Sequence, residues 1–360
     1  MNSINWYGIS YEKHTCYDPD IKTGENSCSL LPRDPSPYFP LRLRLGPLLF
    51  SLYVAPLQDI KAAHRLDSMF YADDSQLYIA INLNDYSPAL DNLRNCIDDV
   101  INWNTLTCSY ATLVKQRSSN LLSHFAQHPV LNCFSFGNTT IELSDKVRNL
   151  GVILDKELSL KQHVNDICKK GILAIRSISQ MRKYLSHDNL KCIVNAFVTS
   201  RLDYCNSVLY GLPKLEHDKL QQIQNIAAWL ITGTKQKEHI TPALKDLHWL
   251  PVKLCIVFKI LLSTYEALNG LSPTYITSLF NVYKPARSLR SSDQLLLQVP
   301  DMKTCTYSQR SFSFYVTKLW NDLPFHIKQS ESIAIFKKTL KTFIFLIVFN
   351  LVIDFHNCIF

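Results

Sequence analysis

The feature that most constrains this chain is a pair of adjacent carboxylates set between two apolar runs. The stretch FYADDSQLYIAI (Phe70 to Ile81) places Asp73 and Asp74 after one short apolar run and before a second. Apolar runs of this length on either side of a polar break predict a β-hairpin with both acids at its turn. Such a turn holds two negative charges where a divalent cation can reach them.

Two neighbouring stretches carry a resemblance to a known family. Tyr71-Ala72-Asp73-Asp74 resembles the catalytic hairpin of reverse transcriptases. LGPLLFSLYVAPLQDI (Leu45 to Ile60) resembles the segment that precedes this hairpin in polymerases of non-LTR, LINE-type retrotransposons. The chain is therefore similar to an RNA-directed DNA polymerase of the CR1- and L2-like group, truncated at the N-terminus. Without the flanking match, a turn that merely favours aspartate would be the better explanation of the two acids.

The resemblance continues through the C-terminal half. NLGVILDKELSLKQHV (Asn149 to Val164) resembles the end of the polymerase palm and the entry to its thumb. Ile240 to Asn269 and Tyr307 to Lys328 resemble, in order and spacing, the region that follows the thumb in these elements. Aromatic side chains in this region could stack on bases. Three of them lie within apolar patterns, which favours a place in the core, namely Trp249, Phe258 and Trp320.

The resemblance implies a polymerase site with two Mg²⁺ ions, an RNA template and a DNA primer. In this scheme Asp73 is a direct ligand of the metals, Asp74 is a second ligand or support, and Tyr71 lies against nucleic acid. A two-metal site needs carboxylates from two separate strands, and this chain supplies only one half of it. The aspartates upstream lie in polar, proline-flanked sequence with no apolar strand to carry them. They are Asp18, Asp20 and Asp34.

Two further parts of the polymerase pattern are missing. Arg42-Leu43-Arg44 stands where the family has a loop that contacts the template and the incoming nucleotide. Asn104 to Gln127 does not resemble the family's lysine-bearing segment, and Lys115 lacks the surrounding pattern. We therefore expect a degenerate retrotransposon copy with little or no polymerase activity by itself.

The expected fold class is α+β, with two hairpins and two helices in a partial palm, followed by a helical thumb and a mixed C-terminal region. In the palm, Leu45 to Ile60 has an apolar face at helical spacing, and Ser87-Pro88 is a good helix start. Cys133 to Leu154 alternates around a Gly137-Asn138 turn, which predicts the second hairpin.

The thumb is expected to consist of three helices with apolar stripes. The stripes run from Val164 to Met181, from Leu190 to Val198 after a Ser186 cap, and from Leu220 to Ile231 before Gly233. The expected regions are an irregular segment 1–40, a partial palm 41–155, a thumb-like region 156–235, a retrotransposon C-terminal region 236–342 and an apolar tail 343–360.

Basic residues cluster along the first of these helices, on positions that its apolar face leaves free. They are Lys169, Lys170, Arg176, Arg182 and Lys183. In a thumb these residues could neutralise phosphates of the template–primer duplex, and a plain solvated face is the alternative. The net charge of +8 suits a polyanionic partner but is also common in ordinary proteins.

Two functions from other classes stay open. A non-catalytic nucleic-acid-binding protein would keep the basic helix and lose only the metals. A tail-anchored membrane protein would use Phe343 to Phe360, although this segment is shorter than the ~20 residues of a spanning helix and contains Asp354. Basic residues just before it would suit a cytoplasmic flank, namely Lys337, Lys338 and Lys341.

The cysteines and the N-terminus point to an intracellular protein, cytoplasmic or nuclear. The 11 cysteines are scattered without the spacing of a zinc site. Met1 to Leu30 contains no apolar run of the secretory type. His124 and His128 have no cysteine or carboxylate near them, so we expect surface or loop positions rather than a metal site.

Overall fold

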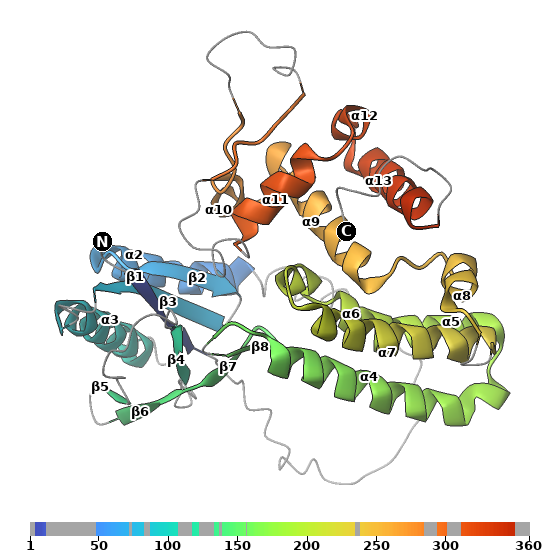
Figure 1. Cartoon of the computed structure of the whole chain (residues 1–360). Coiled ribbons are helices and arrows are strands. Elements are labelled where there is room, and N and C mark those ends of the chain that lie inside the picture. The colour runs from blue at the N-terminus through green and yellow to red at the C-terminus, as the bar shows by residue number, and fades with distance from the viewer. Residues whose placement is uncertain are drawn as a thin grey trace, which may run out of the picture. The chain divides into compact units, whose positions relative to one another are not determined.

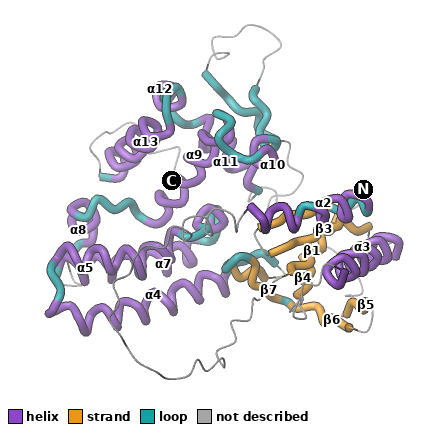
Figure 2. Tube along the Cα trace, turned by 180° about the vertical axis from the view of Figure 1, so that it is seen from behind, coloured by secondary structure: helices purple, strands orange, loops and turns teal. Residues whose placement is uncertain are grey.

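The computed structural model consists of two compact units, unit 1 (Met1–Ser159) and unit 2 (Leu160–Phe360). It describes residues 4–11, 48–71, 74–82, 87–106, 117–121, 133–136, 139–155, 157–234, 238–283, 294–300 and 311–349. Figure 1 shows strands and helices in unit 1, whereas every labelled element of unit 2 is a helix. Figure 2 shows the same separation by colour. The chain is therefore α+β, as the sequence predicts. Several sequence predictions fall outside the described residues: those on Asp18, Asp20, Asp34, Arg42, Leu43, Arg44, Asp73, Lys115, His124 and His128.

The main sheet of unit 1 has six strands in the order β2-β3-β1-β4-β6-β5. β1 lies between β3 and β4 and is antiparallel to both. With α2 before β2 and α3 after β3, the first six named elements run β-α-β-β-α-β, the order of ferredoxin-like folds. The strands are β1 (Ile4–Tyr11), β2 (Asp67–Tyr71), β3 (Asp74–Asn82), β4 (Arg117–Leu121), β5 (Cys133–Phe136) and β6 (Thr139–Ser144).

The N-terminal strand corrects the prediction that residues 1–40 are irregular. β1 pairs with β3 from Ile4↔Asn82 to Tyr11↔Ser75. The segment is rich in residues that favour strands but stands alone in a polar N-terminus, so its partners, which come from more than 60 residues later, were not visible locally. β4 was missed for the same reason: RSSNL has no apolar alternation and pairs with β1 and β6.

The helices of unit 1 cover one face of the hairpin. α3 (Ser87–Leu106) begins at the predicted Ser87. Its Leu93, Cys96 and Ile97 form a buried cluster with Leu77 and Ile79 of β3. Because residues two apart on a strand share a face, α3 packs on one side of β3 and leaves the other side to different partners.

The predicted helix at Leu45 to Ile60 is only partly right. Residues 48–54 are helical, a turn follows at Ala55, and α2 then runs over Pro56–Ala63. Leu57 is buried. The other leucines of the predicted apolar face are 56–64% exposed, namely Leu48, Leu49 and Leu52. The turn before Pro56 separates the two helical segments, so the stripe does not continue from one to the other.

The region Cys133 to Leu154 contains two hairpins instead of the single one predicted. β5 and β6 pair across the predicted Gly137-Asn138 connection, with Phe136 opposite Thr139. A second hairpin joins β7 (Lys146–Asn149) to β8 (Val152–Asp155). Its turn residues Leu150 and Gly151 both have positive φ, as the tightest hairpin turns require.

The first helices of unit 2 follow the predicted caps. α4 (Lys161–Met181) packs against α7 (Lys214–Thr232), and these helices lie side by side in Figures 1 and 2. Ser186 caps α5 (His187–Val194) by accepting a hydrogen bond from the Asn189 amide, and Gly233 ends α7 with φ 76°. The predicted apolar stripes of these helices were wrong at two positions, because Met181 and Phe197 are exposed. Met181 ends α4 before a 3₁₀ turn, and Phe197 lies in the π-helix Asn195–Thr199, whose wider turn breaks the α-helical register.

The rest of unit 2 is built around α9 (Val252–Leu268), which packs against α7, α11 and α13. Trp320 is 1% exposed, as its apolar pattern predicts, whereas Trp249 and Phe258 are only half-buried. Tyr265 of α9 stacks on Phe336 with ring centroids 4.2 Å apart. The remaining helices are α6 (Ser200–Asp203), α8 (Ile240–Asp246), α10 (Thr274–Thr277), α11 (Phe312–Asn321), α12 (Phe325–Lys328) and α13 (Ile333–Val348).

Part of the apolar tail belongs to this core. α13 ends at Val348, and its Ile344 and Ile347 are 1% and 3% exposed. Residues 350–360 lie outside the described part of the chain. Within the part that is described, no helix combines the length and the apolar character needed to cross a membrane.

Candidate functional site

The predicted hairpin forms. β2 and β3 pair antiparallel in register from Asp67↔Tyr78 to Tyr71↔Asp74. Asp74 is the first residue of β3, and Asp73 lies outside the described residues. Tyr71 is 65% exposed at the end of β2. The pairing therefore brings Tyr71 and Asp74 opposite each other at one end of the sheet.

A buried polar contact holds the other face of β3. Gln76 is 4% exposed, and its amide nitrogen donates a hydrogen bond to the side-chain oxygen of Asn149 on β7. Asn149 Nδ2 donates in return to Gln76 Oε1 at 3.2 Å, and the Tyr78 hydroxyl also donates to this oxygen. Burial raises the pKa of Tyr78, so the phenol stays a donor. The sequence patterns did not predict this contact. A glutamine within an otherwise apolar strand is the feature that could have indicated it.

The strand beside the hairpin has no acid. β1 reads INWYGISY and pairs with β3 along its whole length. Its end at Tyr11 lies opposite Ser75, next to Asp74. Between Ile4 and Tyr11 there is no carboxylate that could share a metal with the hairpin. Among the residues that the structure describes, no three histidine, cysteine, aspartate or glutamate side chains form a group that could hold a metal ion.

A buried lysine lies under the same sheet. Lys61 of α2 is 2% exposed, and burial lowers its pKa to about 8. Cys96 of α3 is fully buried, and burial raises the pKa of its thiol to about 11. Burial therefore favours the neutral amine of Lys61 over the charged form.

We expect Lys61→Met to stabilise unit 1 by about 1–3 kcal/mol at pH 7, because methionine fills similar space without a desolvated charge. Lys61 has an ordinary pKa of 10.5 and a folded pKa of about 8, so between these values the unfolded chain binds more protons. The wild type therefore gains stability as the pH rises through 8, and the advantage of the variant should shrink between pH 7 and 9.

Urea unfolding at several pH values measures this difference. The exposed Lys146→Met is the control and should change stability by less than about 0.5 kcal/mol. A Lys61→Met protein less stable than the wild type at pH 7 would show that the ammonium is stabilising where it lies.

Two of the predicted basic residues share one side of α4, and a third lies just beyond its end. Lys169 and Arg176 are exposed and seven residues apart, which on a helix places them on one side at a step of about 10.5 Å, and the exposed Lys183 lies in the 3₁₀ turn (Arg182–Tyr184) that follows α4. The exposed Leu173 and Gln180 lie between them at the same helical spacing. We call Lys169, Arg176 and Lys183 the basic stripe. Lys183 Nζ also lies 4.8 Å from the ring centre of Tyr184, which is 77% exposed.

The other two predicted basic residues have structural partners. Lys170 Nζ donates to Asp166 Oδ2 at 2.6 Å, within the same helix. Arg182 Nη2 lies so close to Gly233 that a Cβ on this glycine would be 2.6 Å from it. A cation at this place stabilises the C-terminal end of α7. The five basic residues therefore do not act as a single group.

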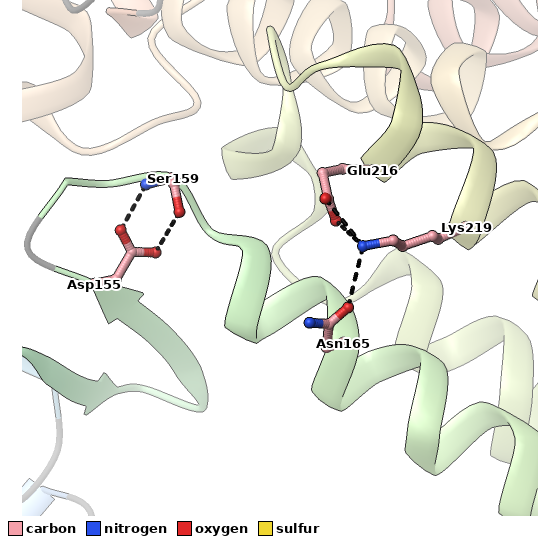
Figure 3. Close-up of polar contacts among 5 residues, drawn as sticks. All are labelled: Asp155, Ser159, Asn165, Glu216 and Lys219. Atoms are coloured by element: carbon pink, nitrogen blue, oxygen red, sulfur yellow. Dashed lines mark hydrogen bonds and ion pairs between the residues drawn. The ribbon is translucent and has the colours of Figure 1, made fainter.

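Figure 3 shows polar contacts at the end of unit 1 and, separately, between α4 and α7 of unit 2. Asp155 accepts two hydrogen bonds from Ser159, from its amide at 2.7 Å and its hydroxyl at 3.1 Å. Lys219 of α7 donates to both oxygens of Glu216 at 3.0 and 3.1 Å and to Asn165 of α4 at 3.3 Å. The helix with the basic stripe is thus fixed to α7 by polar contacts as well as by its apolar face.

No protein-family model, curated protein or solved structure matches this chain. The relation to reverse transcriptases therefore stays a resemblance carried by the residues quoted above.

Proposed function

We propose that this chain is a reverse transcriptase-like protein that binds an RNA–DNA duplex and has little or no polymerase activity of its own. The observation that carries the proposal is the pairing of β1 with β3. In the β-α-β-β-α-β order of unit 1, β1 is the central strand beside the Asp73-Asp74 hairpin, and it contains no acidic residue. A degenerate polymerase palm accounts for both the arrangement and the missing carboxylate.

The chemistry of a nucleotidyl transfer explains why this loss matters. A two-metal site stabilises the attacking and leaving oxygens with two Mg²⁺ ions, and Mg²⁺ prefers oxygen ligands in near-octahedral geometry. Asp73 and Asp74 could hold one ion from the hairpin. The neighbouring strand offers no carboxylate for the second. The residues that the structure describes therefore do not supply a complete two-metal site, and we derive no catalytic step from them.

Duplex binding needs only the basic stripe. Lys169 and Arg176 lie on one side of α4, Lys183 lies just beyond its end, and none of the three forms an ion pair with a carboxylate of the described residues. Contacts of this kind neutralise phosphates without reading sequence. The alternative of a domesticated, non-catalytic nucleic-acid-binding protein differs from this proposal only in having no remaining metal chemistry. The alternative of a membrane anchor finds no support in α13, because the apolar face of this helix is buried.

Primer extension tests the catalytic half of the proposal. Purified full-length protein with Mg²⁺, a homopolymer RNA template and a DNA primer should give no extension above a protein-free control. The Asp73→Ala variant should be indistinguishable from the wild type. Extension by the wild type that disappears in Asp73→Ala would contradict the proposal, because it would require a working metal site at the hairpin.

A further inference from the structure

Unit 2 contains a cavity with aromatic and cationic walls that the proposed function does not use. Its volume is about 330 Å³, and its walls include Trp249, Phe258, Lys259 and Lys341. This volume is near the lower end of the ~300–1,000 Å³ of small-molecule pockets. Thr199, the last residue of the π-helix Asn195–Thr199, also lines the cavity. π-Helical turns are frequent at functional sites.

Hydrogen bonds fix the floor of the cavity. Gln224 is 4% exposed and donates from Nε2 to the carbonyl of Leu250 at 2.9 Å. Cys255 Sγ donates to the same carbonyl at 3.2 Å. Gln221 Oε1 accepts a hydrogen bond from the Val252 amide at 2.9 Å. Side chains of α7 and α9 therefore fix the backbone that directly follows Trp249.

The charges of the cavity favour an anion. Lys259 and Lys341 are exposed, and neither makes an ion pair within 4.0 Å with a carboxylate of the described residues. Asp203 is the acid of the cavity, and burial raises its pKa while Lys259 opposes that rise. Two lysines against one aspartate leave an excess of one positive charge at pH 7. Burial also raises the pKa of Cys255 to about 12, so this thiol is a poor nucleophile and the cavity is suited to binding.

We propose that this cavity binds one nucleotide, with the base against Trp249 and Phe258 and the phosphate at Lys259 and Lys341. Base stacking on aromatic side chains and charge-assisted bonds to phosphate are the two interactions that these walls offer. The proposal concerns unit 2 alone and needs neither the metal site nor the basic stripe. The nucleotide is either free or one unit of a single strand, since both present the same base and phosphate.

Calorimetric titration of the full chain with AMP, GMP, CMP and UMP, each alone, tests the proposal. At least one should bind at least about tenfold tighter than its nucleoside or inorganic phosphate, because only the nucleotide uses both walls. Lys259→Gln with Lys341→Gln should weaken this binding about tenfold or more, and Trp249→Leu should weaken it by a similar factor. Trp249→Phe, which keeps an aromatic ring, should recover most of the loss.

Controls separate the possible outcomes. Lys337→Gln with Lys338→Gln removes the same two charges from α13 outside the cavity wall and should bind as the wild type does. Octamers of adenylate and uridylate identify the source: binding of mononucleotides alone indicates a free nucleotide, and binding of octamers alone indicates a single strand. The proposal is overturned if neither binds, if phosphate binds as tightly as the nucleotides, or if binding survives both the double lysine variant and Trp249→Leu.

Discussion

Replacing Lys169, Arg176 and Lys183 together with glutamine is expected to weaken binding to an RNA–DNA duplex by about tenfold or more at 0.1 M salt. The three side chains are exposed, on α4 and on the 3₁₀ turn that follows it, so the variant should fold normally. Each lost phosphate contact also removes a released counterion, and the slope of log K against log salt should fall by about 2–3. Fluorescence anisotropy with a labelled hybrid over 50–200 mM salt measures both quantities.

Two controls make this result specific to the basic stripe. Lys214, Lys245 and Lys337 are exposed on helices of unit 2 other than α4, and changing these three to glutamine removes the same charge. That variant should keep most of the affinity. Lys170→Gln should also have a small effect, because Lys170 is paired with Asp166. Equal losses in the stripe variant and the dispersed variant would mean that net charge, and not α4, accounts for binding.

Gly171→Leu is expected to destabilise unit 2 by about 1–3 kcal/mol or more, because α4 and α7 meet closely at this residue. A Cβ on Gly171 would lie only 2.8 Å from Ile223 Cγ2. The helices would have to separate, and the basic stripe would lose the support that α7 provides. Thermal unfolding followed by circular dichroism measures the loss.

Ser177→Leu is the matched control for this substitution. Ser177 is exposed on the same helix, so the added side chain meets no neighbour and stability should change by less than about 0.5 kcal/mol. Equal stability of Gly171→Leu and the wild type would show that α4 and α7 do not need the close approach at Gly171.

Local features of the fold were predictable because short-range chemistry decides them. Ser186 and Gly233 mark a helix start and end through a side-chain oxygen and a left-handed backbone, and the structure has both. The β2–β3 and β5–β6 hairpins follow from strand-forming runs that are separated by polar residues in the sequence. Each signal lies within about ten residues of the feature that it predicts.

Long-range features were not predictable in the same way. β1 becomes a strand through partners far along the chain, and β4 has no apolar pattern of its own. Leu48, Leu49 and Leu52 have the spacing of a buried face but are exposed. For the candidate site, the sequence indicated the hairpin acids and all five basic residues, but only the structure separates the stripe from Lys170 and Arg182.

The most direct test of the central claim is the affinity for an RNA–DNA duplex over 50–200 mM salt, for the wild type and for Asp73→Ala with Asp74→Ala. Each protein is measured once with Mg²⁺ and once with EDTA. We predict strongly salt-dependent binding that is the same in all four cases, because the basic stripe and not a metal site holds the duplex. Binding that needs Mg²⁺ and is lost with the two aspartates would contradict the claim, as would the absence of salt-dependent binding.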